Sequence, residues 1–414
     1  MALVDEMKYL RAACAVALTG STVRAAQALH LSQSSVTRAV LALEASLQQV
    51  LFDRSGRGMQ PTPEGHALLA RGIRALQHLV VTPQRKSSRS EMLRWMGCRL
   101  SLGMGARHIQ VLLSLSRTGS ETLSAAQLGI SQSAVHQTLA QLEHFSERAL
   151  FVRSRQYGLR LTELGDQVMR GCKLCLSELQ QADEVLAAMS GRVEGRIVIG
   201  TLPFSVGPLL PRAVDQVMRA LPGLQVTIID GTYDALLNQL RDAEIDLMVG
   251  ALRAQLSAPG LMQEALFVDR LAVVVRADHP LAHRQKLVWR DLRDAQWIMP
   301  MPNTPAQAVF ERVLNDAGLK LPAAGLRVNS ALMMQSLLMQ SERLAMMSPR
   351  QIQAEVQAGL LAVLPLSMPD AVRTIGLIRR SDLLLTPGMQ MLLDTCRQVA
   401  RHIDGSENGN KQNA

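Results

Sequence analysis

The sequence predicts a multidomain α/β protein, in which two copies of one helical unit precede a half where strands and helices alternate. Three observations lead to this prediction. The segment that starts at Gly20-Ser21 returns at Gly119-Ser120, 99 residues later. From Gly195 onward, short β-branched runs alternate with helical stretches, as in a mostly parallel sheet covered on both faces. A chain of 414 residues is also too long for one ordinary core.

The repeat continues in register far beyond its first residues. The first copy carries Ser32-Gln33-Ser34, Val36, Leu43-Glu44, Leu51-Phe52 and Arg54-Ser55. The second copy carries the equivalents Ser131-Gln132-Ser133, Val135, Leu142-Glu143, Leu150-Phe151 and Arg153-Ser154. An internal repeat of this length indicates two units of the same fold on one polypeptide.

Each copy has the pattern of a helix-turn-helix unit. In the first copy a helical stretch over 7–18 comes first, and Ser32 can later cap a helix through its hydroxyl. Val36, Val40 and Leu43 recur in that helix at positions i, i+4 and i+7, so they form a buried stripe. The other face carries polar side chains that could reach base edges, namely Ser32, Gln33, Ser34, Ser35, Thr37 and Arg38.

A hairpin, the wing, follows this helix in both copies. Residues 54–58 are rich in Gly and Arg, as at a hairpin tip, and Thr62-Pro63 then supplies a cap and the first residue of another helix. Arg54 could hold the wing or touch phosphate, and Arg57 suits a narrow minor groove. The candidate DNA contacts of the second copy are Gln132, Ser133, His136 and Gln137 on its helix and Arg153 and Arg155 on its wing.

Charge and composition favour double-stranded DNA as the partner of the repeated half. The net charge of +9 is uneven, since residues 1–195 carry +7 and residues 196–414 carry +2. Only 3% of residues are aromatic, which argues against recognition of single strands by stacking. The five scattered cysteines indicate a reducing compartment. Without a signal peptide pattern or a membrane-spanning apolar run, the sequence predicts a cytoplasmic protein with no membrane partner.

These patterns divide the chain into expected segments. They are a first winged domain over 1–82, a basic linker over 83–98, a second winged domain over 99–162, a linker or dimerisation helix over 163–194, a two-lobed α/β domain over 195–404, and a disordered polar tail over 405–414. Within the α/β domain we expect lobe I over 195–270 and 383–404, and lobe II over 271–382.

A set of motifs extends over nearly the whole chain. In the first copy they are Gly20-Ser21, Ala25-Ala26, Leu29, Ser32-Gln33, Val36, Leu43-Glu44, Leu51-Phe52, Arg54 and Thr62-Pro63-Glu64-Gly65. In the second half they are Gly195-Arg196-Ile197-Val198-Ile199-Gly200, Leu210-Pro211, Leu236-Leu237, Leu240, Asp246-Leu247, His279-Pro280-Leu281 and Gly359-Leu360. Through these motifs the chain resembles the LysR-type transcriptional regulators. Its second winged unit departs from that family, whose members ordinarily carry one.

The resemblance implies several properties beyond the residues themselves. It implies a periplasmic-binding-protein-like effector domain, a small-molecule co-inducer, and a homodimer or homotetramer, with RNA polymerase as a further possible partner. Ala251-Leu252-Arg253, Gln263-Glu264-Ala265-Leu266-Phe267 and Asn303-Thr304-Pro305 look most like the branch that contains sugar-responsive and aromatic-catabolism regulators. A sugar or a carboxylate is therefore the class of co-inducer to expect.

The chemistry of the two helices predicts that the first copy is the main base reader. Arg38 can pair with phosphate or reach guanine, whereas its counterpart Gln137 carries no charge. Two interpretations of the second copy stay open. It is a second, weaker DNA contact, which its polar face favours, or a degenerate duplicate kept for packing or dimerisation.

We expect the effector between the two lobes, at the carboxyl ends of the strands. The segment 201–205 follows the first strand and precedes a helix whose N-terminal amides favour an anion, and 303–305 opens a helix of the opposite lobe. The candidate contacts are Thr201, Pro203, Phe204, Ser205, Asn303 and Thr304. In the alternative interpretation the Ser and Thr residues only cap helices. A group of methionines, Met333, Met334 and Met339, could supply an adaptable wall.

The sequence predicts no catalytic residue, no metal site and no cofactor. Cys172 and Cys175 lack a second ligand pair, so we expect them to pack as small apolar residues of a helix. The function predicted is that of a ligand-responsive, sequence-specific transcriptional regulator. The alternatives are a cytosolic small-molecule receptor and an architectural DNA-binding protein without inducer-dependent regulation.

Overall fold

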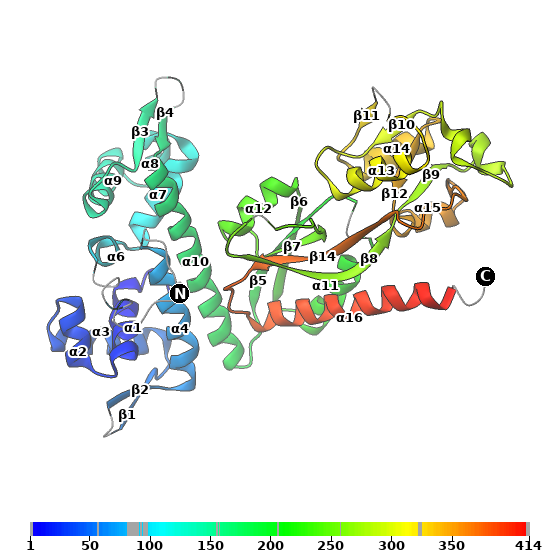
Figure 1. Cartoon of the computed structure of the whole chain (residues 1–414). Coiled ribbons are helices and arrows are strands. Elements are labelled where there is room, and N and C mark those ends of the chain that lie inside the picture. Colours follow the sequence, from blue (N-terminus) through cyan, green and yellow to red (C-terminus); the bar gives the residue numbers. More distant parts are fainter. Residues whose placement is uncertain are drawn as a thin grey trace. The chain divides into compact units, whose positions relative to one another are not determined.

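The computed structural model describes residues 3–55, 58–80, 91, 93, 98–154, 156, 158–204, 207–256, 258–321 and 325–410. The chain forms two units, Met1–Gly195 and Arg196–Ala414, which are described separately below. Figure 1 shows the helices and strands of both. Within the described part of the chain, no helix is long and apolar enough to cross a membrane.

The first copy of the repeat folds into three helices, a hairpin and a fourth helix. These are α1 (Met7–Thr19), α2 (Thr22–Leu29), α3 (Gln33–Leu47), β1 (Phe52–Ser55), β2 (Gly58–Pro61) and α4 (Pro63–His78). Hydroxyl side chains cap α2, α3 and α4, as the sequence predicts. Ser32 Oγ accepts from the backbone of Ser35 at 3.2 Å, and Thr62 Oγ1 accepts from that of Gly65 at 3.0 Å.

The second copy repeats this order after one short helix. Its elements are α6 (Arg99–Gly103), α7 (Ala106–Thr118), α8 (Glu121–Leu128), α9 (Gln132–Ser146), β3 (Phe151–Ser154), β4 (Gly158–Leu161) and α10 (Glu163–Met189). Ser131 caps α9 through a 3.2 Å bond, and Thr162 caps α10 through a 3.0 Å bond. The two copies therefore use the same residue types for the same local contacts.

One glutamate in each copy ties the long helix to the start of the wing. Glu44 Oε1 accepts from both backbone N–H groups of Leu51-Phe52, at 2.9 and 3.2 Å. Glu143 Oε1 does the same for Leu150-Phe151, at 2.9 and 3.4 Å. The carboxylate satisfies donors that the turn would otherwise leave buried and unpaired.

A single hydrophobic core extends through both copies. It runs from Leu3 to Ala182 and includes buried residues of α1, α3, α4, α7, α9 and α10. In this core α4 packs along α10, the helix that the sequence predicts as a dimerisation helix. The helix expected to pair with another chain thus packs on the first copy of the same chain.

The second unit contains two five-stranded sheets. The order of the first sheet is β6-β5-β7-β14-β8, and that of the second is β11-β10-β12-β9-β13. The strands of the first sheet are β5 (Gly195–Thr201), β6 (Leu224–Asp230), β7 (Leu247–Ala251), β8 (Leu261–Arg270) and β14 (Val372–Arg380), and those of the second are β9 (Ala272–Arg276), β10 (Trp297–Met299), β11 (Leu326–Arg327), β12 (Leu344–Met347) and β13 (Leu361–Val363). These two sheets form the cores of the predicted lobes.

Helices cover both sheets. They are α11 (Leu209–Ala220), α12 (Tyr233–Arg241) and α16 (Pro387–Asn410) in the first lobe, and α13 (Pro305–Asp316), α14 (Ala331–Met339) and α15 (Gln353–Gln357) in the second. Buried residues of α11 and α16 share a core with β5, β7 and β14. Leu236 and Leu240 of α12 pack in a separate core with Val198 and Met248. The first sheet is therefore covered on both faces.

Two boundaries expected from the sequence are wrong. The expected lobe II includes residues 372–380, but β14 pairs antiparallel with β7 and β8, so this segment returns to lobe I. The expected disordered tail begins at residue 405, but α16 continues to Asn410. Most of the expected linker, including residues 83–90, lies outside the described residues.

Candidate functional site

The capped face of α3 presents the residues predicted to read DNA. Ser32, Gln33, Ser34 and Arg38 are exposed, and Ser35 and Thr37 are half-buried. Their contacts are local: Gln33 donates to Thr22 Oγ1 at 3.4 Å, and Arg38 Nε donates to the Ser34 carbonyl at 3.4 Å. Arg38 can therefore donate hydrogen bonds to a phosphate or to guanine.

The wings are described only in part. Arg54 lies on β1, opposite Met59, and the structure describes its backbone but not its side chain. Arg57 and Arg155, two further predicted contacts, also lie outside the described residues. For Arg153 on β3 the structure describes the side chain, which is exposed.

Beside the equivalent face of α9 lies an acidic side chain of α8, where the first copy has a hydroxyl. Gln132, Ser133, His136 and Gln137 are exposed. Glu121, the first residue of α8, lies 3.4 Å from His136 Nδ1 and 3.4 Å from Arg153 Nη2. Thr22 stands at the equivalent position of the first copy. The carboxylate therefore engages two of the side chains that could otherwise approach DNA phosphates.

A cavity of about 360 Å³ lies between the two lobes of the second unit. Leu202, Pro203, Phe204 and Thr232 line it from the first lobe, and Pro300, Asn303, Thr304 and Met346 line it from the second. This volume is near the lower end of the range for small-molecule sites. Its walls are mostly apolar, which suits a compact ligand with an apolar body.

One arginine of this cavity has unused hydrogen-bonding capacity. Arg253 follows β7 and stacks on Tyr233, with its guanidinium carbon 3.6 Å from the ring centroid. Its Nε is buried and makes no hydrogen bond among the described residues. The exposed carboxylate of Asp234 lies 3.8 Å from Arg253 Nη1. A ligand carboxylate could complete the pairing of this cation.

A second arginine of the cavity is already neutralised. Arg373 of β14 lies within 3.0 Å of Asp269, and both residues are buried. Burial lowers the pKa of Arg373, and Asp269 opposes that effect. Arg373 Nη2 also donates to the Phe204 carbonyl, and Ser348 Oγ donates to Asp269 at 2.6 Å. This network fixes the wall of the cavity between its strands.

The structure separates the predicted effector residues into two groups. Pro203, Phe204, Asn303 and Thr304 line the cavity. Thr201 does not, because it is 2% exposed and donates to Asp230. Ser205 lies outside the described residues.

Thr304 caps a helix, as the alternative interpretation of these residues expects. Its hydroxyl accepts from the backbone of Gln307 at 3.2 Å and donates to Met301 O at 2.8 Å. Thr304 therefore has little capacity left for a ligand. Among the three predicted methionines, Met334 lines the cavity, whereas Met333 and Met339 are exposed elsewhere.

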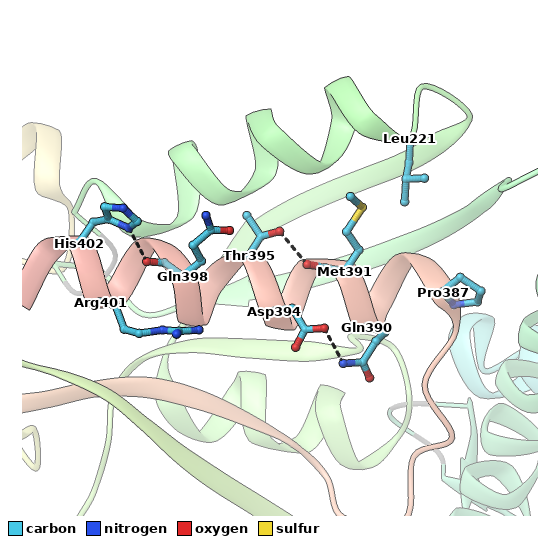
Figure 2. Close-up of a pocket in the computed structure, with 9 residues that line it drawn as sticks. All are labelled: Leu221, Pro387, Gln390, Met391, Asp394, Thr395, Gln398, Arg401 and His402. Carbon is cyan, nitrogen blue, oxygen red and sulfur yellow. Dashed lines mark hydrogen bonds between the residues drawn. The ribbon is translucent and has the colours of Figure 1, made fainter.

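A larger hollow of about 980 Å³ lies along α16 beside α11. Figure 2 shows that it is lined almost entirely by one face of α16. The hydrogen bonds drawn there join residues of that helix to one another, such as Gln390 to Asp394 and Thr395 to the Met391 carbonyl. A broad groove whose polar groups already pair within the helix is a poorer ligand site than the smaller cavity between the lobes.

The cysteines behave as core residues. Cys172 and Cys175 are fully buried, and burial raises the pKa of the Cys172 thiol to about 12. Such thiols stay protonated and unreactive at neutral pH. Among the described residues no group of three or more His, Cys, Asp or Glu side chains could hold a metal ion.

Two winged helix-turn-helix units and a two-lobed α/β domain define the class of this protein, a transcriptional regulator with an effector-binding domain. The model of the bacterial regulatory helix-turn-helix protein, lysR family, matches residues 7–66 and again residues 106–166. The model of the LysR substrate binding domain matches residues 190–401. The chain therefore belongs to the LysR family of transcriptional regulators, and the predicted duplication of its winged unit is confirmed.

The relatives differ in how much of this chain they match. The HTH-type transcriptional regulator GalR of Pseudomonas putida is 33% identical over 396 residues, which cover 96% of this chain and 98% of GalR. That match extends over both winged units. The regulator PcaQ of Agrobacterium fabrum is 28% identical and covers 73% of this chain and 97% of its own length, which leaves about a quarter of this chain unmatched.

The fold also resembles that of a solved family member. A variant of full-length OxyR from Pseudomonas aeruginosa superposes with a TM-score of 0.53 at 20% identity. The alignment covers 71% of this chain and 95% of OxyR. At this identity the likeness supports the fold alone.

Several residues of these sites were not predicted from the sequence. Arg253 could have been found, because it follows a buried strand at the edge where ligands bind. Glu121 could have been found by comparing the copies position by position, since it replaces Thr22. Arg373 could not, because its strand falls within the segment expected to form the other lobe.

Proposed function

We propose that this regulator binds specific double-stranded operator DNA through α3, with a weaker contact from α9, and that a small carboxylate with an apolar body binds between the lobes. The observation that carries the DNA assignment is the contrast between the two helix faces. Arg38 is exposed on α3, whereas Glu121 holds His136 and Arg153 beside α9. The predicted contacts Arg54, Arg57 and Arg155 remain part of this proposal as wing contacts.

The DNA assignment is tested with two variants of the full chain. Duplexes are selected from a random-sequence pool at fixed salt, because affinity alone reports mostly the phosphate contribution. Arg38→Ala should abolish preference at a base position of the selected site, whereas Gln137→Ala should have a smaller effect. If Gln137→Ala relaxes sequence preference more than Arg38→Ala, α9 is the main reader and the assignment is wrong.

The ligand assignment rests on Arg253. Its guanidinium lines a cavity that also has walls of Met, Pro and Phe, and its ion pair with the exposed Asp234 is long, at 3.8 Å. Such a site favours a carboxylate, because the guanidinium of Arg253 can pair with it while the Met, Pro and Phe side chains contact its apolar body. A small aromatic or branched carboxylate fits both the volume and the charge.

A pair of matched probes tests this assignment. Thermal unfolding of the full chain is measured with benzoate and related monocarboxylates, and with their neutral amides. The carboxylates should raise the melting temperature more than the amides do, and Arg253→Met should remove the difference. Equal effects of acid and amide would contradict the assignment. We also propose, from its family, that the protein acts in the cytoplasm and forms oligomers.

A further inference from the structure

The helices α4 and α10 are equivalent elements of the two copies. Each follows a wing and begins after a Thr cap, Thr62 in one and Thr162 in the other. Gly65 and Gly165 occupy the same place near each helix start, where a Cβ would overlap the backbone before the wing. The offset between equivalent residues is thus 100 after the longer second wing.

These two helices pack along each other in the core that the two copies share. Each carries buried residues at equivalent positions with alternating three- and four-residue spacing, namely Leu68, Gly72, Ala75 and Leu79 in the α4 segment and Val168, Cys172, Cys175 and Leu179 on α10. Part of the α4 stripe faces α1, since a Cβ at Gly72 would meet Leu10 and Cys14. The backbones of α4 and α10 approach closely where a Cβ at Gly171 would overlap the carbonyl oxygen of His78.

Polar contacts show that the pair is antiparallel and built around equivalent positions. Arg71 donates to Gln181 at 2.8 Å, and Arg74 lies 2.8 Å from Glu178, so later residues of α4 meet earlier residues of α10. His78 Nε2 lies 3.9 Å from Glu178 Oε1. His78 and Glu178 are equivalents, and contact between equivalent positions is typical of a twofold dimer interface.

The charges on these helices favour the pairing of α4 with α10 over the pairing of two α4 helices or of two α10 helices. Arg71 and Arg74 of α4 surround Glu178 of α10, which is 5% exposed. Burial acts to raise the pKa of Glu178, but hydrogen bonds from His78 and Arg74 hold it below its ordinary value. Two α10 helices in the same arrangement would bury two such carboxylates together, and two α4 helices would bring their arginines together, each at a large cost.

A second contact joins the copies away from this helix pair. Arg11 of α1 donates to the carbonyl oxygens of Ser101 and Met104, at or just after α6, the latter at 3.2 Å. The Arg11 side chain is buried, and burial lowers its pKa. The two winged units are therefore held together by a shared core and by buried polar bonds.

We infer that the two winged units of one chain form an intramolecular, dimer-like pair through α4 and α10, and that a single chain binds an operator of two unequal half-sites, α3 on one and α9 on the other. In Figure 1, α3 and α9 lie on the same side of this helix pair, with the two wings at its opposite ends. The half-sites differ because α3 carries Arg38 where α9 carries Gln137. This inference rests on the proposed function, since it requires both helices to contact DNA.

Selection from random-sequence duplexes of about 50 base pairs with the full chain tests the two half-sites, since this length exceeds the spacing of two half-sites one or two helical turns apart. We expect enriched duplexes to carry two different motifs at a fixed spacing. Arg38→Ala should relax one motif and Gln137→Ala the other. A single motif, or two motifs that respond to the same variant, would overturn the inference. If no sequence is enriched at all, the proposed function fails instead.

A charge reversal tests the coupling between the units. Glu178→Arg places a cation against Arg71 and Arg74, which should separate the two winged units. The second unit then no longer binds at the high effective concentration that the pairing provides, so we expect about 10- to 100-fold weaker binding to the two-motif duplex. Binding to a duplex with the α3 motif alone should persist, which shows that the unit still folds. The combined variant R71E/R74E/E178R should recover two-motif binding. Unchanged two-motif affinity in Glu178→Arg would contradict the inference.

A crosslink distinguishes pairing within one chain from exchange between two chains. Arg74→Cys and Ser177→Cys, at two half-buried positions on the facing helices, are combined in a Cys98→Ser background and treated with a short bismaleimide. The remaining native cysteines are buried and should not react. We expect crosslinked material at the mass of one chain on a denaturing gel. Material at twice that mass would show that α4 and α10 pair between chains, and would overturn the inference.

Discussion

Glu121 Oε2 lies 3.4 Å from Nδ1 of His136, on the face of α9 that corresponds to the proposed DNA-reading face of α3. The same carboxylate contacts Arg153 on the wing, so it lowers the positive potential at both elements. The first copy has Thr22 in this place. This one substitution between the copies therefore gives the two proposed DNA surfaces different charges.

Two single variants, each placing one copy's residue in the other copy, should change the affinity for DNA in opposite directions. Glu121→Thr releases Arg153 for a phosphate, so binding should tighten several-fold and the slope of log K against log salt should steepen by about 1. Thr22→Glu should weaken binding and flatten the slope. Fluorescence anisotropy across a salt series measures both. No change in either variant would show that neither helix start faces DNA.

Loss of one wing brace should destabilise both copies, because they share a core. Glu44→Ala leaves two backbone N–H groups without their acceptor, at a cost of about 1–3 kcal/mol each. Urea unfolding should report this loss, and hydrogen exchange should show faster exchange in 120–160 as well as in 20–60. Faster exchange confined to the first copy would mean that the units unfold independently.

Glu178 should contribute stability that depends on pH. Because its pKa in the folded protein is below the ordinary value of 4.5, its contribution is fully present above about pH 4.5 and is lost as pH falls through the folded-state pKa. Glu178→Gln should therefore reduce the free energy of unfolding at pH 7, and the difference from the unmodified chain should shrink in acid. Glu147→Gln is the control, since Glu147 forms an exposed pair with Arg99. A deficit that stays constant with pH would contradict this account.

Substitution of the two cavity arginines should affect stability differently, with a large loss for Arg373 and a small one for Arg253. Arg373→Met leaves the buried Asp269 without its main partner, so we expect a loss of about 3–5 kcal/mol in the stability of the effector domain. Arg253→Met should change stability by less than about 1 kcal/mol, since its ion pair with Asp234 is long and partly exposed. Thermal unfolding without ligand measures both. The reverse order would mean that Arg253 is structural.

Local features of the fold could be predicted from the sequence. Ser32, Ser131, Thr62 and Thr162 cap the expected helices, since a cap depends on residues only a few positions apart. The repeat itself placed both wings. The family matches then confirm the regulator predicted from these patterns.

Long-range pairing could not be predicted in the same way. β14 joins lobe I through contacts with strands about 100 or more residues earlier, and no local pattern records that pairing. The helix over 163–194 could be predicted, but its partner could not: the sequence suggested another chain, whereas α4 of the same chain packs along α10. The lining of the cavity between the lobes could be predicted only in part for a related reason, because Tyr233, Arg253 and Arg373 come from three separate segments.

The most direct test measures how many chains bind to each pair of half-sites. Native mass spectrometry of the full chain, bound to a selected duplex and to duplexes with one motif removed, gives the number of chains per motif. The account predicts one chain for each pair of unlike motifs, with weaker binding but unchanged stoichiometry when either motif is removed. One chain for every motif would show that only one winged unit of each chain contacts DNA, and would contradict the account.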